Sequence, residues 1–127
     1  MIWILALLAL LALVTLWRVR IRSRRAEADF PPEGLFLHFG ENRVHYVQKG
    51  KGPDLVLIHG ASGNTRDFTF ALMDALSDRY RVTIFDRPGL GHSPRLARRG
   101  VTLRDQADLL AEAAQRLGVK DPDRKSV

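Results

Sequence analysis

The chain has 127 residues, which is enough for one domain of ordinary size. It contains no cysteine, and this excludes disulfides, thiol nucleophiles and cysteine metal sites. The formal net charge is +6, but five of these excess charges come from the arginines between Arg18 and Arg25. Because the remainder of the chain is nearly neutral, we expect no nucleic-acid partner.

The amino-terminal seventeen residues contain no charged side chain and a single polar one, Thr15. An apolar run of this length, followed by arginines that can reach the headgroups, predicts a transmembrane segment with Trp3 and Trp17 near its two interfaces. A cleaved signal peptide would carry basic residues before the apolar run and a small-residue cleavage site after it. Neither is present, so the pattern favours a signal anchor over a cleaved signal.

These features divide the chain into three parts. We expect a transmembrane signal anchor at residues 1–22, a basic juxtamembrane segment and linker at residues 23–34, and a globular domain at residues 35–127. Membrane lipid is the expected partner of the segment from Met1 to Arg25, because arginines attract anionic headgroups. The positive-inside tendency places the globular part in the cytoplasm, with the periplasmic or extracellular side as the alternative.

The globular part begins with patterns that predict β-strands. Residues 35–39 and 43–49 flank a short polar turn and predict an antiparallel hairpin at a sheet edge, with alternate residues facing opposite sides. Residues 55–58 and 81–85 are continuous apolar runs of the kind found in central parallel strands. His38 and His45 fall on the hairpin strands, and we expect them to be partly buried or surface residues without a catalytic role.

One helix is predicted after each of these parallel strands. The first covers residues 65–76, and Thr102 begins the second, with Asp105 completing a variant of the capping box. Gly118 is suited to end the second helix, and Asp121 with Pro122 would turn the chain toward a further strand. Apolar spacing predicts the buried positions Phe68, Leu72 and Leu76 in the first helix and Leu103, Ala107, Leu110, Ala114 and Leu117 in the second.

Each apolar strand is followed by a glycine-rich motif: HGASGN runs from His59 to Asn64, and DRPGLGHS runs from Asp86 to Ser93. In this order and spacing the two motifs resemble the front half of the α/β-hydrolase family, and the resemblance covers residues 36–122. It implies an α/β fold with a partial α/β-hydrolase sheet of about four strands and two crossover helices. In that family the third strand lies between the fourth and the fifth.

The resemblance also implies a role for the first motif. The residue after His-Gly donates its backbone N–H to the oxyanion of an acyl-transfer reaction, which is Ala61 here, with Ser62 as a second choice. The alternative is that Gly60 and Gly63 only permit a tight turn between strand and helix.

Two further residues of these motifs are expected to be structural. His59 is expected to form hydrogen bonds rather than to act as a base. Asp86 is expected to accept hydrogen bonds from N–H groups of the turn at residues 87–93.

No complete nucleophile elbow of the form G-x-S-x-G is present. Asn64 stands where the motif around Ser62 needs its last glycine, and Pro94 and Arg95 follow Ser93. Since the family places the elbow after its fifth strand, we expect residues 35–127 to be a truncated domain that is inactive alone. The charged tail, residues 123–127, is expected not to form that fifth strand, which leaves residues 55–58 as an exposed edge.

By resemblance the intact enzyme would be a hydrolase of the esterase, peptidase or C–C hydrolase type, acting on a small-molecule carbonyl substrate without a cofactor. Relatives with the same motifs include dehalogenases and epoxide hydrolases, whose nucleophile is aspartate, so the nucleophile stays open between serine and aspartate. The four histidines fall on separate elements, and we expect no metal site. The alternative function is a non-catalytic, membrane-tethered module that binds a partner strand at the exposed edge.

Overall fold

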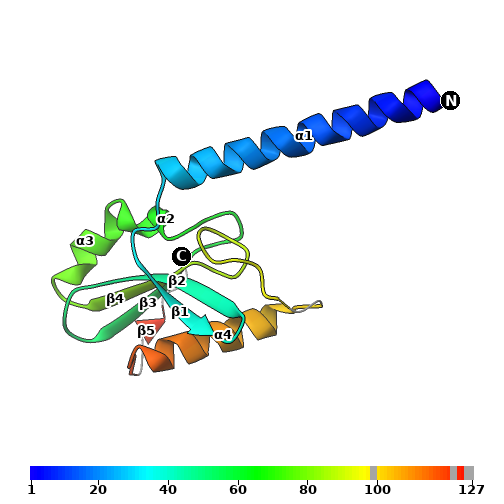
Figure 1. Ribbon diagram of the computed structural model, residues 1–127. Coiled ribbons are helices and arrows are strands. Elements are labelled where there is room, and N and C mark those ends of the chain that lie inside the picture. The colour runs from blue at the N-terminus through cyan, green and yellow to red at the C-terminus, as the bar shows by residue number, and fades with distance from the viewer. Residues whose placement is uncertain (98–99, 121–122, 125–127) are drawn as a thin grey trace. The chain divides into compact units, whose positions relative to one another are not determined.

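The computed structural model describes residues 1–97, 100–120 and 123–124. The chain forms two units, Met1–Pro31 and Pro32–Val127. The first unit is the helix α1 (Ile2–Asp29), drawn in blue in Figure 1. Its leucine and alanine content favours a helix, and prolines at positions 31 and 32 prevent its continuation. By length and composition α1 could cross a membrane.

Helix α1 runs through the arginine cluster and ends only at Asp29. Residues 23–29 of the predicted basic juxtamembrane segment and linker are therefore helical. The cause is that arginine, alanine and glutamate are good helix formers, so the change from apolar to charged side chains does not end the helix. Only the residues after Asp29 connect α1 to the second unit.

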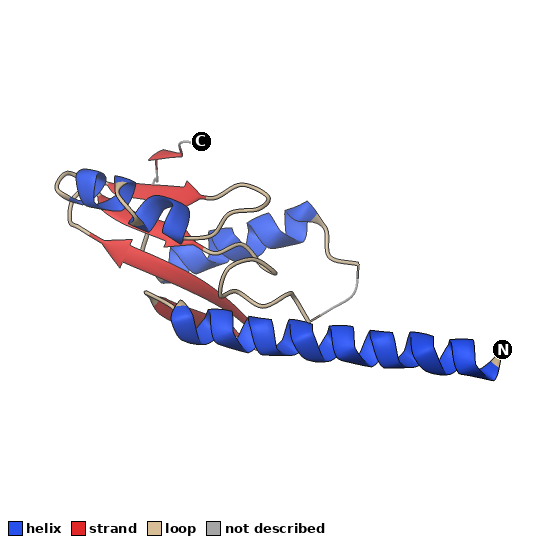
Figure 2. Cartoon of the chain, turned by 90° about the horizontal axis from the view of Figure 1, so that it is seen from above, coloured by secondary structure: helices blue, strands red, loops and turns tan. Residues whose placement is uncertain are grey.

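The second unit is built on a five-stranded sheet with the order β1-β2-β4-β3-β5. Strands β1, β2 and β4 pair antiparallel, whereas β3 pairs parallel with both β4 and β5. This order confirms that β3 lies between β4 and β5. Figure 2 shows the sheet with its helices in a view from above. The strands are β1 (Leu35–Phe39), β2 (Asn42–Lys49), β3 (Asp54–Ile58), β4 (Arg81–Phe85) and β5 (Asp123–Arg124).

Strand β5 corrects one expectation. It pairs with β3, with Leu55 opposite Asp123 and Val56 opposite Arg124. The expectation that the tail cannot form this strand is wrong for these two residues, because the pairing uses backbone groups that charged residues also possess. The predicted turn at Asp121 and Pro122, and residues 125–127, lie outside the described part of the chain.

Helices pack on the sheet and form two groups of buried side chains. The short helices α2 (Arg66–Thr69) and α3 (Leu72–Ser77) cover one group, and α4 (Leu103–Arg116) covers the other. Along β2, Val47 packs in the first group while Val44 and Tyr46 pack in the second, which confirms the predicted alternation of faces. The buried residues are Leu55, Leu57, Phe68, Met73, Val82 and Ile84 in the first group, and Val44, Phe85, Leu110 and Ala113 in the second.

The helix predicted at residues 65–76 is divided into α2 and α3. Ala71 has a φ of −151°, so the helical geometry is interrupted there. The interruption changes which side chains face the sheet: Met73 is buried, whereas Leu72, predicted to be buried, is exposed. Phe68 and Leu76 pack in the core as predicted.

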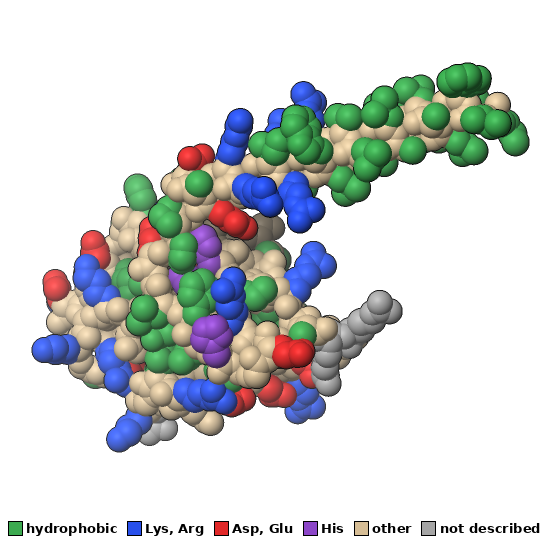
Figure 3. All heavy atoms as spheres, viewed as in Figure 1, with side chains coloured by type: hydrophobic (Ala, Val, Ile, Leu, Met, Phe, Trp, Pro, Cys, Tyr) green, Lys and Arg blue, Asp and Glu red, His purple; other side chains and the backbone are tan. Residues whose placement is uncertain are grey.

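Helix α4 begins and ends as predicted. Thr102 and Asp105 form a reciprocal capping box, and Gly118 has a φ of +68° after the last turn. The predicted buried stripe is correct for the second half of the helix only. Leu103 is 73% exposed and Ala107 is exposed too, because the helix packs against the core only from Leu109 onward. Figure 3 shows the side chains of each type on one face of the molecule.

Candidate active site

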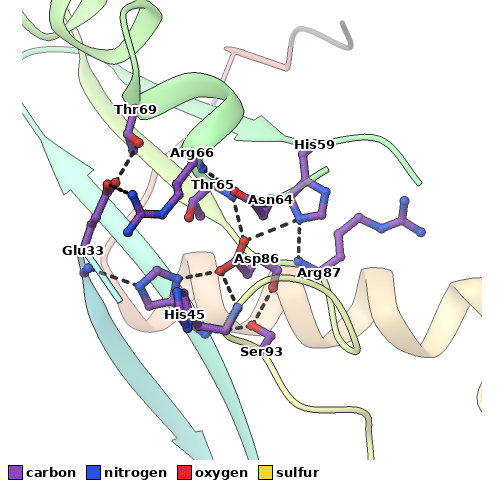
Figure 4. A network of polar contacts seen from close by, with 12 residues as sticks. Glu33, His45, His59, Asn64, Thr65, Arg66, Thr69, Asp86, Arg87 and Ser93 are labelled. Carbon is purple, nitrogen blue, oxygen red and sulfur yellow. Dashed lines mark hydrogen bonds and ion pairs between the residues drawn. The ribbon is translucent and has the colours of Figure 1, made fainter. Parts of the chain in front are cut away.

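Two loops meet where the parallel strands β3 and β4 end. Strands β3 and β4 are parallel and end side by side, with Ile58 opposite Phe85, so the motifs that follow them begin next to each other. We call residues 59–65 the oxyanion loop and residues 86–93 the DRPG loop. The N–H of Arg87 in the DRPG loop donates to Nε2 of His59 in the oxyanion loop at 3.0 Å (Figure 4).

His59 is buried and uses both ring nitrogens. Because Nε2 accepts from Arg87, the proton lies on Nδ1, which donates to the carbonyl oxygen of Gly60 at 2.8 Å. This arrangement agrees with the structural role expected for His59. It leaves neither ring nitrogen free to take a proton from a substrate.

Ala61 and Ser62 lie in the exposed turn of the oxyanion loop. A hydrogen bond of 3.3 Å from the N–H of Gly63 to the carbonyl oxygen of Gly60 closes this turn. No described residue accepts a hydrogen bond from the N–H of Ala61 or of Ser62. Both N–H groups are therefore available to a ligand.

The two glycines of the oxyanion loop differ in their surroundings. A side chain at Gly63 would collide with the carboxylate of Asp67, so a close approach explains this glycine. A Cβ at Gly60 would meet no atom within 4 Å, and its φ is not positive. Close approach thus explains Gly63, whereas neither a contact nor a positive φ requires glycine at position 60.

Asp86 follows β4 and is fully buried. Its Oδ1 accepts from the N–H of Thr65 at 2.7 Å, and its Oδ2 accepts from the N–H of His92 at 2.9 Å and from Nδ1 of His45 at 2.7 Å. The bond from His92 confirms the expected contact with the turn at residues 87–93. The bond from Thr65 shows that Asp86 also holds the end of the oxyanion loop, as Figure 4 displays.

The protonation of Asp86 follows from these contacts. Burial raises the pKa of Asp86, but the hydrogen bonds from His45, His92 and Thr65 outweigh burial and hold its pKa below the usual value. The carboxylate is therefore ionised at neutral pH and cannot donate a proton in a reaction.

His45 is also fully buried, contrary to the expectation of a partly buried or surface residue. Its Nε2 accepts from the N–H of Gly34 at 3.1 Å, so its proton lies on Nδ1 and is donated to Asp86. The rings of His45 and His92 form an edge-to-face contact, with centroids 5.2 Å apart. The contact between His45 and Asp86 follows from the pairing of β2 with β4, which places His45 close to the residue after Phe85.

Ser93 and Ser62 do not have the geometry of an activated nucleophile. Ser93 is buried, and its hydroxyl donates to the carbonyl oxygen of Asp86 at 2.7 Å and accepts from the N–H of His45 at 2.9 Å. Ser62 is exposed, and no described histidine hydrogen-bonds to it. Among the described residues there is also no group of three or more side chains suited to hold a metal ion.

Two curated proteins illustrate the similarity of this chain to known sequences. The dihydrolipoyllysine-residue acetyltransferase component of the acetoin cleaving system from Cupriavidus necator is 42% identical over 80 residues, which are 61% of this chain and 21% of that protein. Haloalkane dehalogenase 2 from Mycobacterium bovis is 32% identical over 91 residues, which are 71% of this chain and 31% of that protein. Other matches are named as an esterase and an epoxide hydrolase.

Solved structures agree with the sequence relatives. The crystal structure of an alpha/beta hydrolase fold protein from Burkholderia ambifaria superimposes with a TM-score of 0.62 at 26% identity, covering 69% of this chain and 32% of that one. The chain thus spans less than a third of the length of each of these three proteins. Residues 53–122, more than half of the chain, match the family model for the alpha/beta hydrolase fold. Together with the strand order and the two loops at the edge of the sheet, this match places the chain in the alpha/beta hydrolase fold family.

Proposed function

We propose that this chain supplies the oxyanion-binding part of a membrane-anchored hydrolase that acts on a small carbonyl substrate. The observation that carries the proposal is the N–H of Ala61, which has no acceptor among the described residues and lies beside the open face of Gly60. The residue lies at the carboxyl end of a central parallel strand, where ligands of open α/β sheets bind.

The chemistry follows from what an acyl-transfer reaction requires. Attack of a nucleophile on a carbonyl carbon places negative charge on the carbonyl oxygen, and the N–H of Ala61, with that of Ser62 as second candidate, donates to this oxygen. His59 and Asp86 hold the two ends of the oxyanion loop by accepting from Arg87 and Thr65, so the donors need not reorganise during the reaction. One such donor contributes about 3 kcal/mol to transition-state stabilisation.

The nucleophile stays open between serine and aspartate. The printed names of the relatives include an acetyltransferase component, a dehalogenase and an esterase, which differ in the bond that they break or form. Neither Ser62 nor Ser93 has a histidine placed to activate its hydroxyl. In our proposal the nucleophile follows β5 in an intact relative, and residues 35–127 do not turn over substrate alone.

The proposal includes attachment to the membrane through α1. The apolar part of this helix would span the bilayer, and the arginines from Arg18 to Arg25 would bind anionic headgroups. The positive-inside tendency favours the cytoplasmic side for the second unit, with the periplasmic or extracellular side as the alternative.

A titration of the full chain in detergent micelles with acetate tests the oxyanion site, because a carboxylate oxygen can replace the oxyanion. We expect the amide resonance of Ala61 to shift with acetate concentration and to saturate, while chloride at equal ionic strength has no such effect. The exposed amide of Lys51, outside the loop, is the internal control. If Ala61 does not respond, or Lys51 responds equally, the proposed donor is wrong.

Turnover of p-nitrophenyl acetate tests the placement of the nucleophile. We expect the full chain, Ser62→Ala and Ser93→Ala to show the same rate as buffer with micelles. Activity that one serine substitution abolishes would show that this serine is the nucleophile and that the chain is an enzyme in its own right.

A specific observation also favours the binding module as a second candidate. Within the described part of the chain, the pairing between β3 and β5 reaches Val56, and Ile58 is 43% exposed at the end of β3. Among the described residues, none pairs with Leu57 or Ile58 on that side of β3, so a partner strand could add there. A chain starting at residue 26 that is soluble and monomeric would favour this candidate, whereas aggregation would favour the incomplete hydrolase.

A further inference from the structure

We propose that Gly34 and Glu33, the residues that connect α1 to the sheet, act as positioning residues for the oxyanion loop. The inference rests on the proposed function of that loop. It assigns these residues a role beyond tethering: Glu33 and Gly34 must keep their contacts within the second unit for the loop to hold its geometry.

A continuous series of hydrogen bonds joins Gly34 to the oxyanion loop. The N–H of Gly34 donates to Nε2 of His45, and Nδ1 of His45 donates to Asp86. The same carboxylate accepts from the N–H of Thr65, the last residue of the loop. His45 and Asp86 are fully buried, so the bond between them is shielded from water (Figure 4).

Glycine at position 34 is required for this contact. A Cβ there would collide with the carbonyl oxygen of Tyr46 and would lie 3.0 Å from Cγ2 of Val47. The φ of Gly34 is not in the left-handed region, so backbone conformation does not explain the glycine. The absence of a side chain is what allows the N–H of Gly34 to reach His45.

Glu33 makes a second connection to the same part of the molecule. Its Oε1 lies 2.9 Å from Nη1 of Arg66, and its Oε2 accepts from the hydroxyl of Thr69 at 2.7 Å. Arg66 and Thr69 are the first and last residues of α2, which directly follows the oxyanion loop. These contacts are partly exposed and therefore weaker than the buried series through His45.

Both connections begin within five residues of the end of α1 at Asp29. The connecting segment thus carries the covalent link to the proposed membrane anchor and also contacts the groups that fix Thr65. Displacing this segment removes the donor of His45 Nε2, and His45 can then rotate away from Asp86. The carboxylate of Asp86, which accepts from the N–H of Thr65, is then held less firmly in place.

Amide hydrogen exchange of the full chain in micelles tests this inference with Gly34→Ala. We expect exchange at Thr65 and His92, the two amides that donate to Asp86, to accelerate about tenfold or more, while Val82 and Ile84 in β4 change far less. The control is Gly40→Ala in the hairpin turn, where a Cβ meets no atom within 4 Å and the φ of +61° adds only local backbone strain. Equal exchange at Thr65 in both variants would overturn the inference.

A second variant decides the outcome if Gly34→Ala does not fold. Glu33→Ala removes only the contacts to Arg66 and Thr69, and we expect about two- to fivefold faster exchange at Thr65. The control is Glu41→Ala, an exposed acid in the hairpin turn. If Gly34→Ala does not fold and Glu33→Ala leaves exchange at Thr65 unchanged, the inference is also overturned.

The acetate titration separates positioning from general stability. If the connecting segment positions the loop, Gly34→Ala weakens the acetate response of Ala61 and Gly40→Ala does not. Faster exchange at Thr65 in Gly34→Ala, combined with no acetate response of Ala61 in the unmodified chain, would support the link between Gly34 and the loop. The same result would refute the oxyanion role of the loop. A normal acetate response in Gly34→Ala with unchanged exchange would refute the positioning role and leave the proposed function standing.

Discussion

Asp86 is the residue on which most contacts of the candidate site depend. Its buried carboxylate accepts three hydrogen bonds, and an asparagine in its place could accept only part of them, because its amide group would face a donor. We expect Asp86→Asn to lower the free energy of unfolding by about 3 kcal/mol, measured by urea denaturation of the full chain in micelles. Asp108→Asn, at an exposed position of α4, is the control. Equal stability of the two variants would contradict the assigned role.

The same carboxylate predicts a dependence of stability on pH. The folded-state pKa of Asp86 lies below its usual value of about 4, so its contribution is present above pH 4 and is lost as the pH falls toward the folded-state pKa. Between about pH 5 and pH 3, unfolding midpoints of the unmodified chain should fall more steeply than those of Asp86→Asn. Parallel profiles for the two proteins would show that Asp86 does not contribute.

Gly91 can be tested against a glycine with similar backbone torsion. Gly91 has a φ of +53°, and a Cβ there would collide with the carboxylate of Asp86. Gly118 has a φ of +68°, but a Cβ there would meet no atom within 4 Å. We expect Gly118→Ala to cost about 1 kcal/mol from backbone strain and Gly91→Ala at least about 2 kcal/mol more, by urea denaturation. Similar losses would mean that the DRPG loop adjusts without cost.

Helix α4 offers a test of which half of its predicted stripe stabilises the fold. Leu110 is buried against Val44 and Phe85, whereas Leu103 is 73% exposed. We expect Leu110→Ala to destabilise the chain by about 2–4 kcal/mol and Leu103→Ala to change stability by less than about 0.5 kcal/mol. Thermal unfolding followed by circular dichroism measures both. A large loss with Leu103→Ala would place a partner on the first turns of α4.

Several elements could be predicted because local signals define them. Apolar runs predicted β3 and β4, and the pair Thr102 and Asp105 predicted the start of α4. The division between α2 and α3 could not be predicted, since neither glycine nor proline marks Ala71. Strand β5 was missed because its pairing depends on the neighbouring backbone of β3 rather than on its own apolar content.

The candidate site was predictable only as far as its two motifs. The motifs indicated the N–H of Ala61 and the bond that Asp86 accepts from the turn at residues 87–93. The roles of His45, Thr65 and Gly34 depend on the pairing of β2 with β4 and on a close approach to Tyr46. No pattern within a single segment reports such contacts between distant segments, so single-sequence reasoning could not find them.

The proposed attachment through α1 predicts that the whole chain behaves as a single-pass membrane protein. After extraction of membranes at alkaline pH it should remain in the pellet. Leu10→Arg places a charge near the middle of the apolar part of α1, which costs about 3 kcal/mol for insertion and should move part of the chain to the supernatant. Leu35→Arg, at an exposed position of β1, is the matched control. Identical distribution of both variants would argue against a membrane-spanning α1.

The contacts around Asp86 also bear on how the second unit unfolds. They join three segments that are distant in sequence: β2 through His45, the oxyanion loop through Thr65, and the DRPG loop through Asp86 and Ser93. If any one segment detaches, a buried charge or donor is left without a partner, at a cost of several kcal/mol. Partly unfolded states are therefore disfavoured, and the sheet and both loops should lose structure in one cooperative transition.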